Sequence, residues 1–269
     1  MAILDNNGLT GLLGELVIRR FKAGKKIVQT SPRQYKQTKN TKEASKLFGY
    51  GSSLASEIRH QLASVTNKFH DPGMVNRFSS PVRAVLTHCY DKQAKVYTFE
   101  EGSFSRLAGF EFNVKSPLIN FLWVKPVLVL DARTLKITIP EFKIPSQFTF
   151  PGRTNTCKVT ISVSQINLNQ GLTKQPFYYT FEIDSHTEDY PTRDILFEVD
   201  NECLCVAGIG LTYYTRTDGV TASYNSKSFN PANIIAAIIT PGVYIEPIEL
   251  PVSNRTYAKE WTDDHRLKL

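Results

Sequence analysis

The sequence predicts an α+β protein that is mainly β: an antiparallel β-sandwich of the immunoglobulin or fibronectin type, preceded by an N-terminal hairpin arm and a helical segment. Three observations predict this class. Between residues 42 and 66 apolar side chains recur every three or four positions, as on one face of a helix. After Lys95 short runs rich in β-branched and aromatic residues alternate with turn residues. A hydrophobic content of 41% over 269 residues is enough to form a core.

Residues 1–37 are predicted to form a basic arm that contains a β-hairpin. The runs 16–18 and 26–28 are apolar and strand-like, and Ala23-Gly24-Lys25 between them suits a tight turn. Ser31-Pro32 ends the hairpin, and the polar stretch that follows is typical of a linker.

Residues 38–92 are predicted to be a helical segment. Thr41 is a plausible N-cap, and the side chains that fall on one face include Leu47, Leu54, Ile58 and Leu62. Glycines at positions 49 and 51 indicate a bend or a close helix crossing. Asp71-Pro72-Gly73 is expected to stop this helix, and Pro81 suits the first turn of a shorter helix through about Tyr90.

Residues 93–242 are predicted to form the sandwich domain. Its strand-like runs are 127–130, 135–139, 157–163, 178–183, 195–199 and 204–214. Asp218-Gly219 is the strongest hairpin signal, and five prolines, at positions 140, 145, 151, 176 and 191, are expected between strands. The apolar run 234–239 fits a strand or a helix. Residues 243–269 are predicted to be an extended C-terminal arm outside the core.

The charge of the chain is concentrated near its N-terminus. Residues 1–95 carry 16 Lys and Arg against 6 Asp and Glu, whereas residues 96–269 carry 16 against 19. Such a block indicates a surface that meets an anionic partner, or a solvated strip. We define the basic patch by eight residues: Arg19, Arg20, Lys22, Lys25, Lys26, Arg33, Lys36 and Lys39.

No catalytic, metal or cofactor site is predicted from motifs. The chain lacks the glycine-rich phosphate loops, the nucleophile elbow and the paired histidines of zinc proteases. Cys203 and Cys205 lie two apart on a predicted strand, but two ligands do not make a tetrahedral zinc site, and Cys89 and Cys157 have no zinc spacing. All four are expected to be free thiols.

The first fifty residues resemble an uncharacterised family of Bacteroidota proteins known only as a domain of unknown function. The matching features are a glycine-spaced opening (Gly8, Gly11, Gly14), Gly24-Lys25 in a basic hairpin, Ser31-Pro32, and a helix led by Thr41. The resemblance implies a β-rich second half of sandwich type. It implies no activity, cofactor or partner.

Two functions from different classes are expected, and the first is favoured. The chain is expected to be a non-enzymatic structural subunit that forms homo-oligomers through its terminal arms, in a filament, tube, surface layer or phage-like particle. Seven apolar residues are expected to make that contact: Leu12, Leu13, Val17, Ile18, Val243, Ile245 and Ile248.

The alternative is a binding module whose basic N-terminal region holds nucleic acid or an anionic glycan. An enzyme with residues dispersed along the sequence is a third class that motifs do not test. No signal peptide is visible, so synthesis in the cytoplasm is expected, and no apolar run is long enough to span a membrane.

Overall fold

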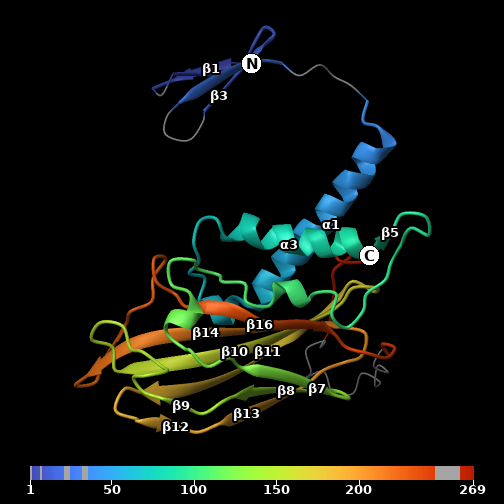
Figure 1. Cartoon of the computed structure of the whole chain (residues 1–269). Helices are drawn as coiled ribbons and strands as arrows, with labels where there is room; N and C mark the ends of the chain where they lie inside the picture. The colour runs from blue at the N-terminus through green and yellow to red at the C-terminus, as the bar shows by residue number, and fades with distance from the viewer. Residues whose placement is uncertain (1, 7, 21–24, 32–35, 246–260) are drawn as a thin grey trace, which may run out of the picture. The chain divides into compact units, whose positions relative to one another are not determined.

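The structure is a computed structural model that describes residues 2–6, 8–20, 25–31, 36–245 and 261–269 (Figure 1). The chain divides into two compact units, Met1–Ala44 and Ser45–Leu269. Antiparallel sheets make up most of the regular structure, with a small set of helices. The predicted class, α+β and mainly β, is therefore confirmed.

The first unit contains a four-stranded antiparallel sheet, here called the N-terminal sheet. Its strands lie in chain order: β1 Ala2–Asp5, β2 Gly8–Leu13, β3 Leu16–Arg20 and β4 Lys26–Thr30. The predicted hairpin is formed by β3 and β4, with Ile18 opposite Val28. The sequence analysis did not assign β1 and β2, because the glycines in this stretch interrupt its apolar alternation.

The helices are α1 Lys39–Gln61, α2 Ala63–Thr66 and α3 Met74–Cys89. The first helix begins earlier than predicted. The predicted N-cap is Thr41, whereas in the structure the hydroxyl of Thr38 accepts a hydrogen bond from the backbone N–H of Thr41 (3.2 Å). The predicted apolar face is confirmed: Leu54, Ile58 and Leu62 are buried, and Leu47 packs at the margin of the same cluster.

The crossing expected near the helix glycines occurs at Gly51. A Cβ on Gly51 would lie 2.3 Å from Cγ of Arg83 in α3, so the two helices pass close together there. Pro81 differs from the prediction because it lies inside α3 and not in its first turn. Buried residues continue on both sides of the proline, among them Phe78 and Val85, so packing outweighs the lost backbone hydrogen bond.

The second unit is built on a six-stranded sheet with the order β15-β14-β10-β11-β17, in which β16 also pairs with β14. Two strands are long, β10 Thr156–Asn167 and β14 Leu204–Thr217, and they pair along most of their length. The other strands are β11 Leu172–Asp184, β15 Val220–Ser223, β16 Ala232–Ile239 and β17 Trp261–Asp263. The ambiguous run 234–239 is thus a strand, and Asp218-Gly219 turns β14 into β15 as predicted.

Smaller sheets and helical turns complete the second unit. A three-stranded sheet has the order β13-β8-β7, and two strand pairs are β12-β9 and β5-β6. Their bounds are β5 Tyr90–Asp91, β6 Val96–Tyr97, β7 Val127–Asp131, β8 Thr134–Ile139, β9 Phe142–Lys143, β12 Asp189–Tyr190 and β13 Arg193–Glu198. The 3₁₀ turns are η2 Ser105–Leu107 and η3 Leu118–Asn120. All six strand-like runs predicted from the sequence are confirmed as strands.

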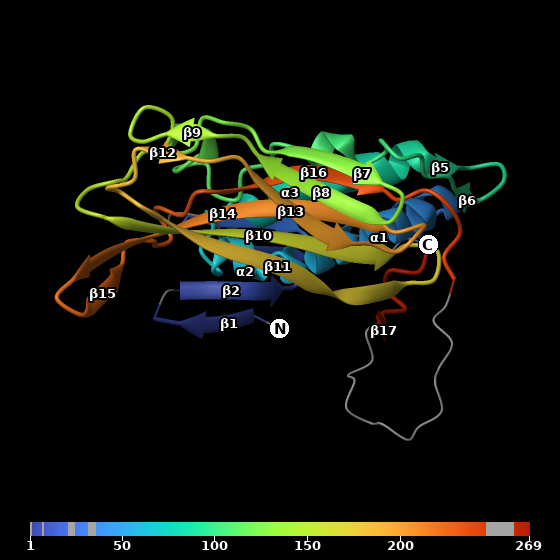
Figure 2. The same cartoon turned by 90° about the horizontal axis from the view of Figure 1, so that it is seen from below.

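The central strands separate two apolar clusters. Figures 1 and 2 show the helices α1 and α3 on one side of the central sheet and the strands β7, β8 and β13 on the other. On β14, Cys205 and Ile209 belong to a cluster shared with β8 and β13, whereas Leu204 and Val206 belong to a cluster shared with α1 and α3. This division follows from the alternation of side chains along a strand. The central sheet is therefore covered on one face by helices and on the other by the three-stranded sheet.

The helical layer approaches β14 at Gly210. A Cβ at this position would lie 2.1 Å from the backbone oxygen of Val65 in α2, so no larger residue fits without a shift of the backbone. Neighbouring Gly208 lies against the side chain of Leu62. Glycines on the helix-facing side of β14 thus set the distance between helix and sheet.

Two features differ from the predicted strand ends. Pro176 lies inside β11 and not between strands, at a β-bulge where the register with β10 shifts between Val163 and Gln165. The C-terminal residues were expected outside the core, but Trp261 in β17 and Leu267 are buried, and β17 pairs with β11. The C-terminal residues differ from the prediction because burying the apolar side chains of Trp261 and Leu267 is favourable.

The carboxylate of Asp71 joins three segments of the second unit. It accepts hydrogen bonds from Nη2 of Arg77 (2.5 Å) and from the backbone N–H groups of Gly73 (2.8 Å) and Val114 (3.3 Å). Burial raises the pKa of this carboxyl, but these hydrogen bonds and the charge of Arg77 hold it below its ordinary value. Asp71 therefore favours the folded state when it is ionised.

We predict that Gly210→Ala lowers the free energy of unfolding by about 1–3 kcal/mol, because the new methyl group overpacks the contact with Val65. Gly49→Ala is the matched control. It lies in α1 with nothing within 4 Å of an added Cβ, so it should raise stability by about 0.5–1 kcal/mol. Urea denaturation followed by circular dichroism measures both, and equal effects would contradict the close approach.

We predict that Asp71→Asn lowers the free energy of unfolding by roughly 1.5–3 kcal/mol at pH 7. Because the pKa of Asp71 is lower in the folded state, its ionised carboxylate stabilises the fold at pH values above the unfolded-state pKa of 3.8. This stabilisation is lost as the pH falls through the folded-state pKa. The difference between wild type and variant should therefore shrink at pH 3. Asp194→Asn, which breaks an exposed pair with Lys136, is the control and should change stability less.

Candidate assembly interface

The register of the N-terminal sheet assigns each side chain to one of two faces. Residues directly opposite each other share a face, and so do residues two apart on one strand. We define the apolar face by Leu4, Leu9, Leu13, Leu16, Ile18 and Val28, with Arg20 and Lys26 at one corner and Thr30, opposite Leu16, at another. We define the mixed face by Ile3, Thr10, Leu12, Val17, Arg19, Ile27 and Gln29.

The N-terminal sheet has no core of its own. Among the residues of the first unit whose side chains the structure describes, none is buried. Leu4 is 76% exposed, Val28 57% and Leu13 52%, although all three are aliphatic. A single sheet normally needs a second layer over an apolar face to be stable in water. This sheet therefore offers a surface that requires a cover.

The predicted assembly residues on the sheet lie on opposite faces. Leu13 and Ile18 belong to the apolar face, whereas Leu12 and Val17 belong to the mixed face. In the second unit, Val243 and Ile245 follow β16 and are 73% and 81% exposed. Ile248 lies outside the described residues, so nothing is said of its position.

The basic patch is also divided. Arg19 lies on the mixed face opposite Ile27, whereas Arg20 lies on the apolar face opposite Lys26. Lys25 and Lys36 are exposed, and Lys39 is the first residue of α1. Two further members, Lys22 and Arg33, lie outside the described residues. The sheet thus distributes its cations over two faces and does not gather them in one stripe.

Sequence reasoning missed a short basic row on α1. Lys39, Lys42 and Lys46 are spaced by three and four residues, so they share one helix face, and all three are exposed. The first turn of α1 carries no acidic residue. Cations near a helix N-terminus oppose the helix dipole, so these lysines do not serve the stability of the helix. Their spacing becomes informative only once the helix start is known.

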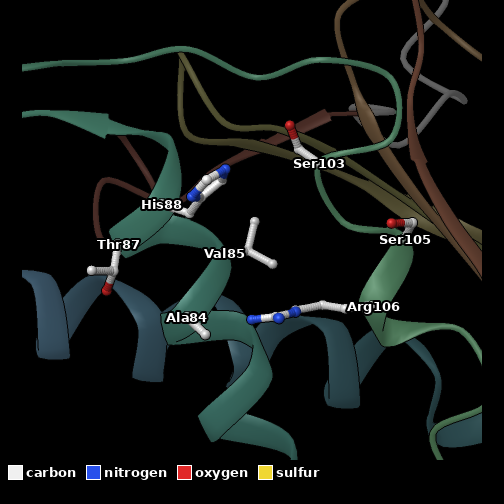
Figure 3. Close-up of a pocket in the computed structure, with 7 residues that line it drawn as sticks. All are labelled: Ala84, Val85, Thr87, His88, Ser103, Ser105 and Arg106. Atoms are coloured by element: carbon white, nitrogen blue, oxygen red, sulfur yellow. The ribbon is translucent and has the colours of Figure 1, made fainter.

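A hollow of about 680 Å³ lies between α3 and η2 in the second unit. Figure 3 shows His88 on α3 and Arg106 on η2 beside it, together with Ser103. The hydroxyl of Ser103 accepts a hydrogen bond from the backbone N–H of Glu100 (2.8 Å), so it is engaged in the local turn and not with the imidazole of His88. None of the described contacts around this hollow therefore activates the hydroxyl of Ser103 as a nucleophile.

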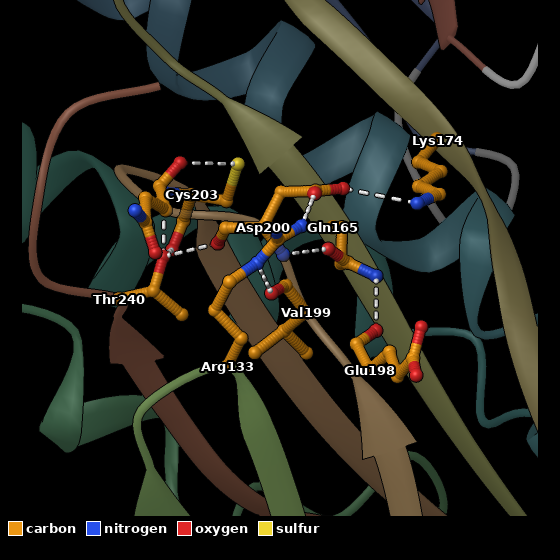
Figure 4. Close-up of polar contacts among 9 residues, drawn as sticks. Arg133, Gln165, Lys174, Glu198, Val199, Asp200, Cys203 and Thr240 are labelled. Atoms are coloured by element: carbon orange, nitrogen blue, oxygen red, sulfur yellow. Dashed lines mark hydrogen bonds and ion pairs between the residues drawn. The ribbon is translucent and has the colours of Figure 1, made fainter. Parts of the chain in front are cut away.

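A polar network of the second unit surrounds Asp200, two residues after the end of β13 (Figure 4). Its carboxylate accepts hydrogen bonds from Arg133 (2.5 Å) and Lys174 (2.9 Å). Its backbone N–H donates to Gln165 on β10 (2.9 Å), and its carbonyl accepts from the hydroxyl of Thr240 (2.6 Å). Both carboxylate oxygens are thus occupied by protein groups, and the network ties the three-stranded sheet to the central sheet.

Three of the four free cysteines are buried, and burial makes their thiols poor acids. It raises the pKa of Cys157 and Cys205 well above the ordinary value. Burial, with the nearby charges of Asp200 and Glu202, raises the pKa of Cys203 to about 12. Cys89 is half-buried. In the part of the chain that the structure describes, no three His, Cys, Asp or Glu side chains gather as metal ligands would.

None of the helices in the described ranges has the length and apolar character needed to cross a bilayer. Comparison of the chain with protein-family models, with curated proteins and with solved structures finds no match.

We predict that one thiol of the native protein, that of Cys89, reacts with a thiol reagent at pH 8 within minutes. The other three should react only after denaturation, because they are buried and protonated at that pH. Titration with Ellman's reagent before and after addition of guanidinium measures this. Cys89→Ser should remove the fast phase, and rapid reaction of a second thiol would contradict the assignment.

Proposed function

We propose that this chain is a non-enzymatic structural subunit that forms homo-oligomers through its N-terminal sheet and the exposed segment around Val243 and Ile245. The observation that carries the proposal is the N-terminal sheet itself, which exposes aliphatic side chains on both faces and buries none. Isolated apolar surface of this kind on a soluble protein marks an interaction site.

The second unit supports this division of roles. It holds two buried clusters, so its stability does not depend on the N-terminal sheet as a source of core residues. Val243 and Ile245 lie at its surface and add exposed apolar area. A body with its own core and an arm without one is the arrangement expected of a subunit that is completed by a neighbour.

The geometry of the contact decides the form of the assembly. A contact that closes on itself gives a dimer or ring, whereas one that does not close propagates as a filament or tube. Surface layers and phage-like particles combine several such contacts. We include all of these forms in the proposed class of function.

Two finer classifications belong to the same proposal. The body is proposed to be a β-sandwich, supported by the cluster that Ile137 and Ile195 share with Ile161 and Ile209 of the central sheet. The first fifty residues are proposed to belong to the uncharacterised Bacteroidota family. This is supported by the glycine-spaced opening, whose Gly8, Gly11 and Gly14 all adopt a positive φ.

A second candidate function is the binding of a polyanion. The observation that favours it is the exposed row Lys39, Lys42 and Lys46 on α1, which begins at Lys39, the last residue of the basic patch. Such a row would hold phosphate or sulfate groups through a salt-sensitive contact. The division of Arg19 and Arg20 between two faces favours assembly over this alternative.

We predict that the full chain forms oligomers at micromolar concentration and that deletion of residues 1–37 yields a folded, strand-rich monomer. Size-exclusion chromatography with light scattering measures the mass, and circular dichroism checks the fold. Raising salt from 50 to 200 mM should weaken assembly only modestly, because apolar burial is insensitive to screening.

The control keeps the length of the chain and removes four charges: Arg19, Arg20, Lys25 and Lys26 are replaced by Gln. This variant should assemble as the wild type does. A wild type that stays monomeric and binds mixed oligonucleotides, with affinity falling about 10³-fold or more over the same salt range, would favour the polyanion function instead. Unchanged assembly of the truncated chain would remove the N-terminal sheet from the contact.

A further inference from the structure

The hollow between α3 and η2 is lined by nitrogen donors and hydroxyl groups. Of the described residues that line it, His88 and Arg106 carry nitrogen donors, three others carry hydroxyls, and none carries a carboxylate. The helix that forms one wall, α3, contains no acidic residue along its whole length. A concave surface with this composition favours an anionic ligand.

Core packing fixes the wall that presents Arg106. Phe104 and Leu107 are both fully buried, and the backbone N–H of Leu107 donates to the carbonyl of Phe104 (3.0 Å). Ser105 and Arg106 lie between these two anchors and are exposed. Figure 3 shows the side chain of Arg106 reaching from η2 toward α3. The arginine is therefore held at the hollow by a turn that the core keeps in place.

No protein carboxylate neutralises the nitrogen donors of this hollow. Within the described part of the chain, neither the guanidinium of Arg106 nor the imidazole of His88 has an ion pair or a hydrogen bond. Another exposed arginine of the second unit does have one, since Arg216 pairs with Glu182. The N–H groups of Arg106 thus remain available to a ligand.

The hydroxyl groups differ in what they can donate. That of Thr87 donates to a backbone carbonyl of its own helix (2.8 Å). That of Ser103 only accepts, from the backbone N–H of Glu100 (2.8 Å), so it keeps its own proton to donate. The hydroxyl of Ser105 has no partner among the described residues. Two hydroxyls therefore remain as neutral donors beside the nitrogen donors.

We propose that this hollow binds a sugar phosphate, with the phosphate on Arg106, His88 and Ser105 and the carbon skeleton over Val85 and Ala84. A guanidinium binds phosphate through two parallel hydrogen bonds, and donors on several sides suit an ion with three terminal oxygens. The hollow of about 680 Å³ is in the size range of small-molecule sites, roughly 300–1,000 Å³, and is larger than a lone phosphate needs.

The adjoining hollow indicates the sugar. It measures about 570 Å³, shares His88 and Ser103 with the first hollow, and adds the carboxylates of Asp91 and Glu100. Repulsion from these carboxylates keeps a phosphate on the Arg106 side of His88. Carboxylates accept hydrogen bonds from hydroxyl groups, so the same ligand is expected to carry hydroxyls on this side.

Equilibrium dialysis of the full chain against radiolabelled glucose 6-phosphate tests the proposal. The wild type should take up one equivalent per chain in a saturable manner. Arg106→Gln should raise the dissociation constant about tenfold or more, because it removes a charge-assisted contact. The matched control is Arg153→Gln, an exposed arginine of the second unit that does not line this hollow. It should change the dissociation constant less than about twofold, because water screens its charge.

A second control separates this hollow from the basic row on α1. Replacement of Lys39, Lys42 and Lys46 by Gln should leave the binding of glucose 6-phosphate unchanged, since none of the three lines the hollow. Arg106 makes no described contact that supports the fold, and circular dichroism of Arg106→Gln checks this. A weaker affinity in a folded variant then reports on the hollow itself.

The opposite results overturn the proposal. Absence of saturable uptake at millimolar ligand would remove the site, and unchanged uptake by Arg106→Gln would place the ligand elsewhere. Loss of uptake in the lysine variant alone would assign the phosphate to the polyanion function. Equal competition by citrate would contradict a phosphate site, and equal affinity for inorganic phosphate would contradict the sugar contacts. The inference is independent of self-assembly, which light scattering measures separately.

Discussion

The body of this protein depends on the burial of β14 and β10 on both faces. Successive side chains of β14 enter different clusters: Cys205 and Ile209 face the three-stranded sheet, whereas Leu204 and Val206 face the helices. The helices and the three-stranded sheet are each held in place by packing against the central sheet, which lies between them. Loss of either cover would leave an apolar sheet face in water, so the helical segment and the three-stranded sheet depend on the same pair of strands.

The same constraint explains the residue sizes on the helix-facing side of the sheet. Gly208 and Gly210 let Leu62 and Val65, at the start of and within α2, approach the strand backbone, and Ser162 and Ser164 of β10 are small and buried. Their hydroxyls donate to backbone carbonyls, Ser162 to Phe177 (3.1 Å) and Ser164 to Val206 (3.4 Å). Small residues at these four positions thus leave room for the helical layer to approach the sheet.

The N-terminal sheet shows what happens when this cover is missing. Its strands are paired and its apolar face is continuous, yet the described residues of the first unit include no buried side chain. The hydrophobic effect stabilises the body by covering its apolar sheet faces. The same effect predicts that this sheet is stable in water only when another layer covers its apolar face. Self-association through this sheet, as proposed above, would supply such a layer.

The sequence by itself determined the features that depend on neighbours in the chain. Alternation predicted the strands of the body, the spacing of Leu54, Ile58 and Leu62 predicted the buried helix face, and Asp218-Gly219 predicted its hairpin. The tertiary structure alone decided which distant segments cover each other. It placed Pro81 inside α3, Pro176 at a bulge and Trp261 in the core, and it sent Arg19 and Arg20 to opposite faces. Local periodicity records only that a face is apolar, whereas packing between distant segments fixes what lies against it.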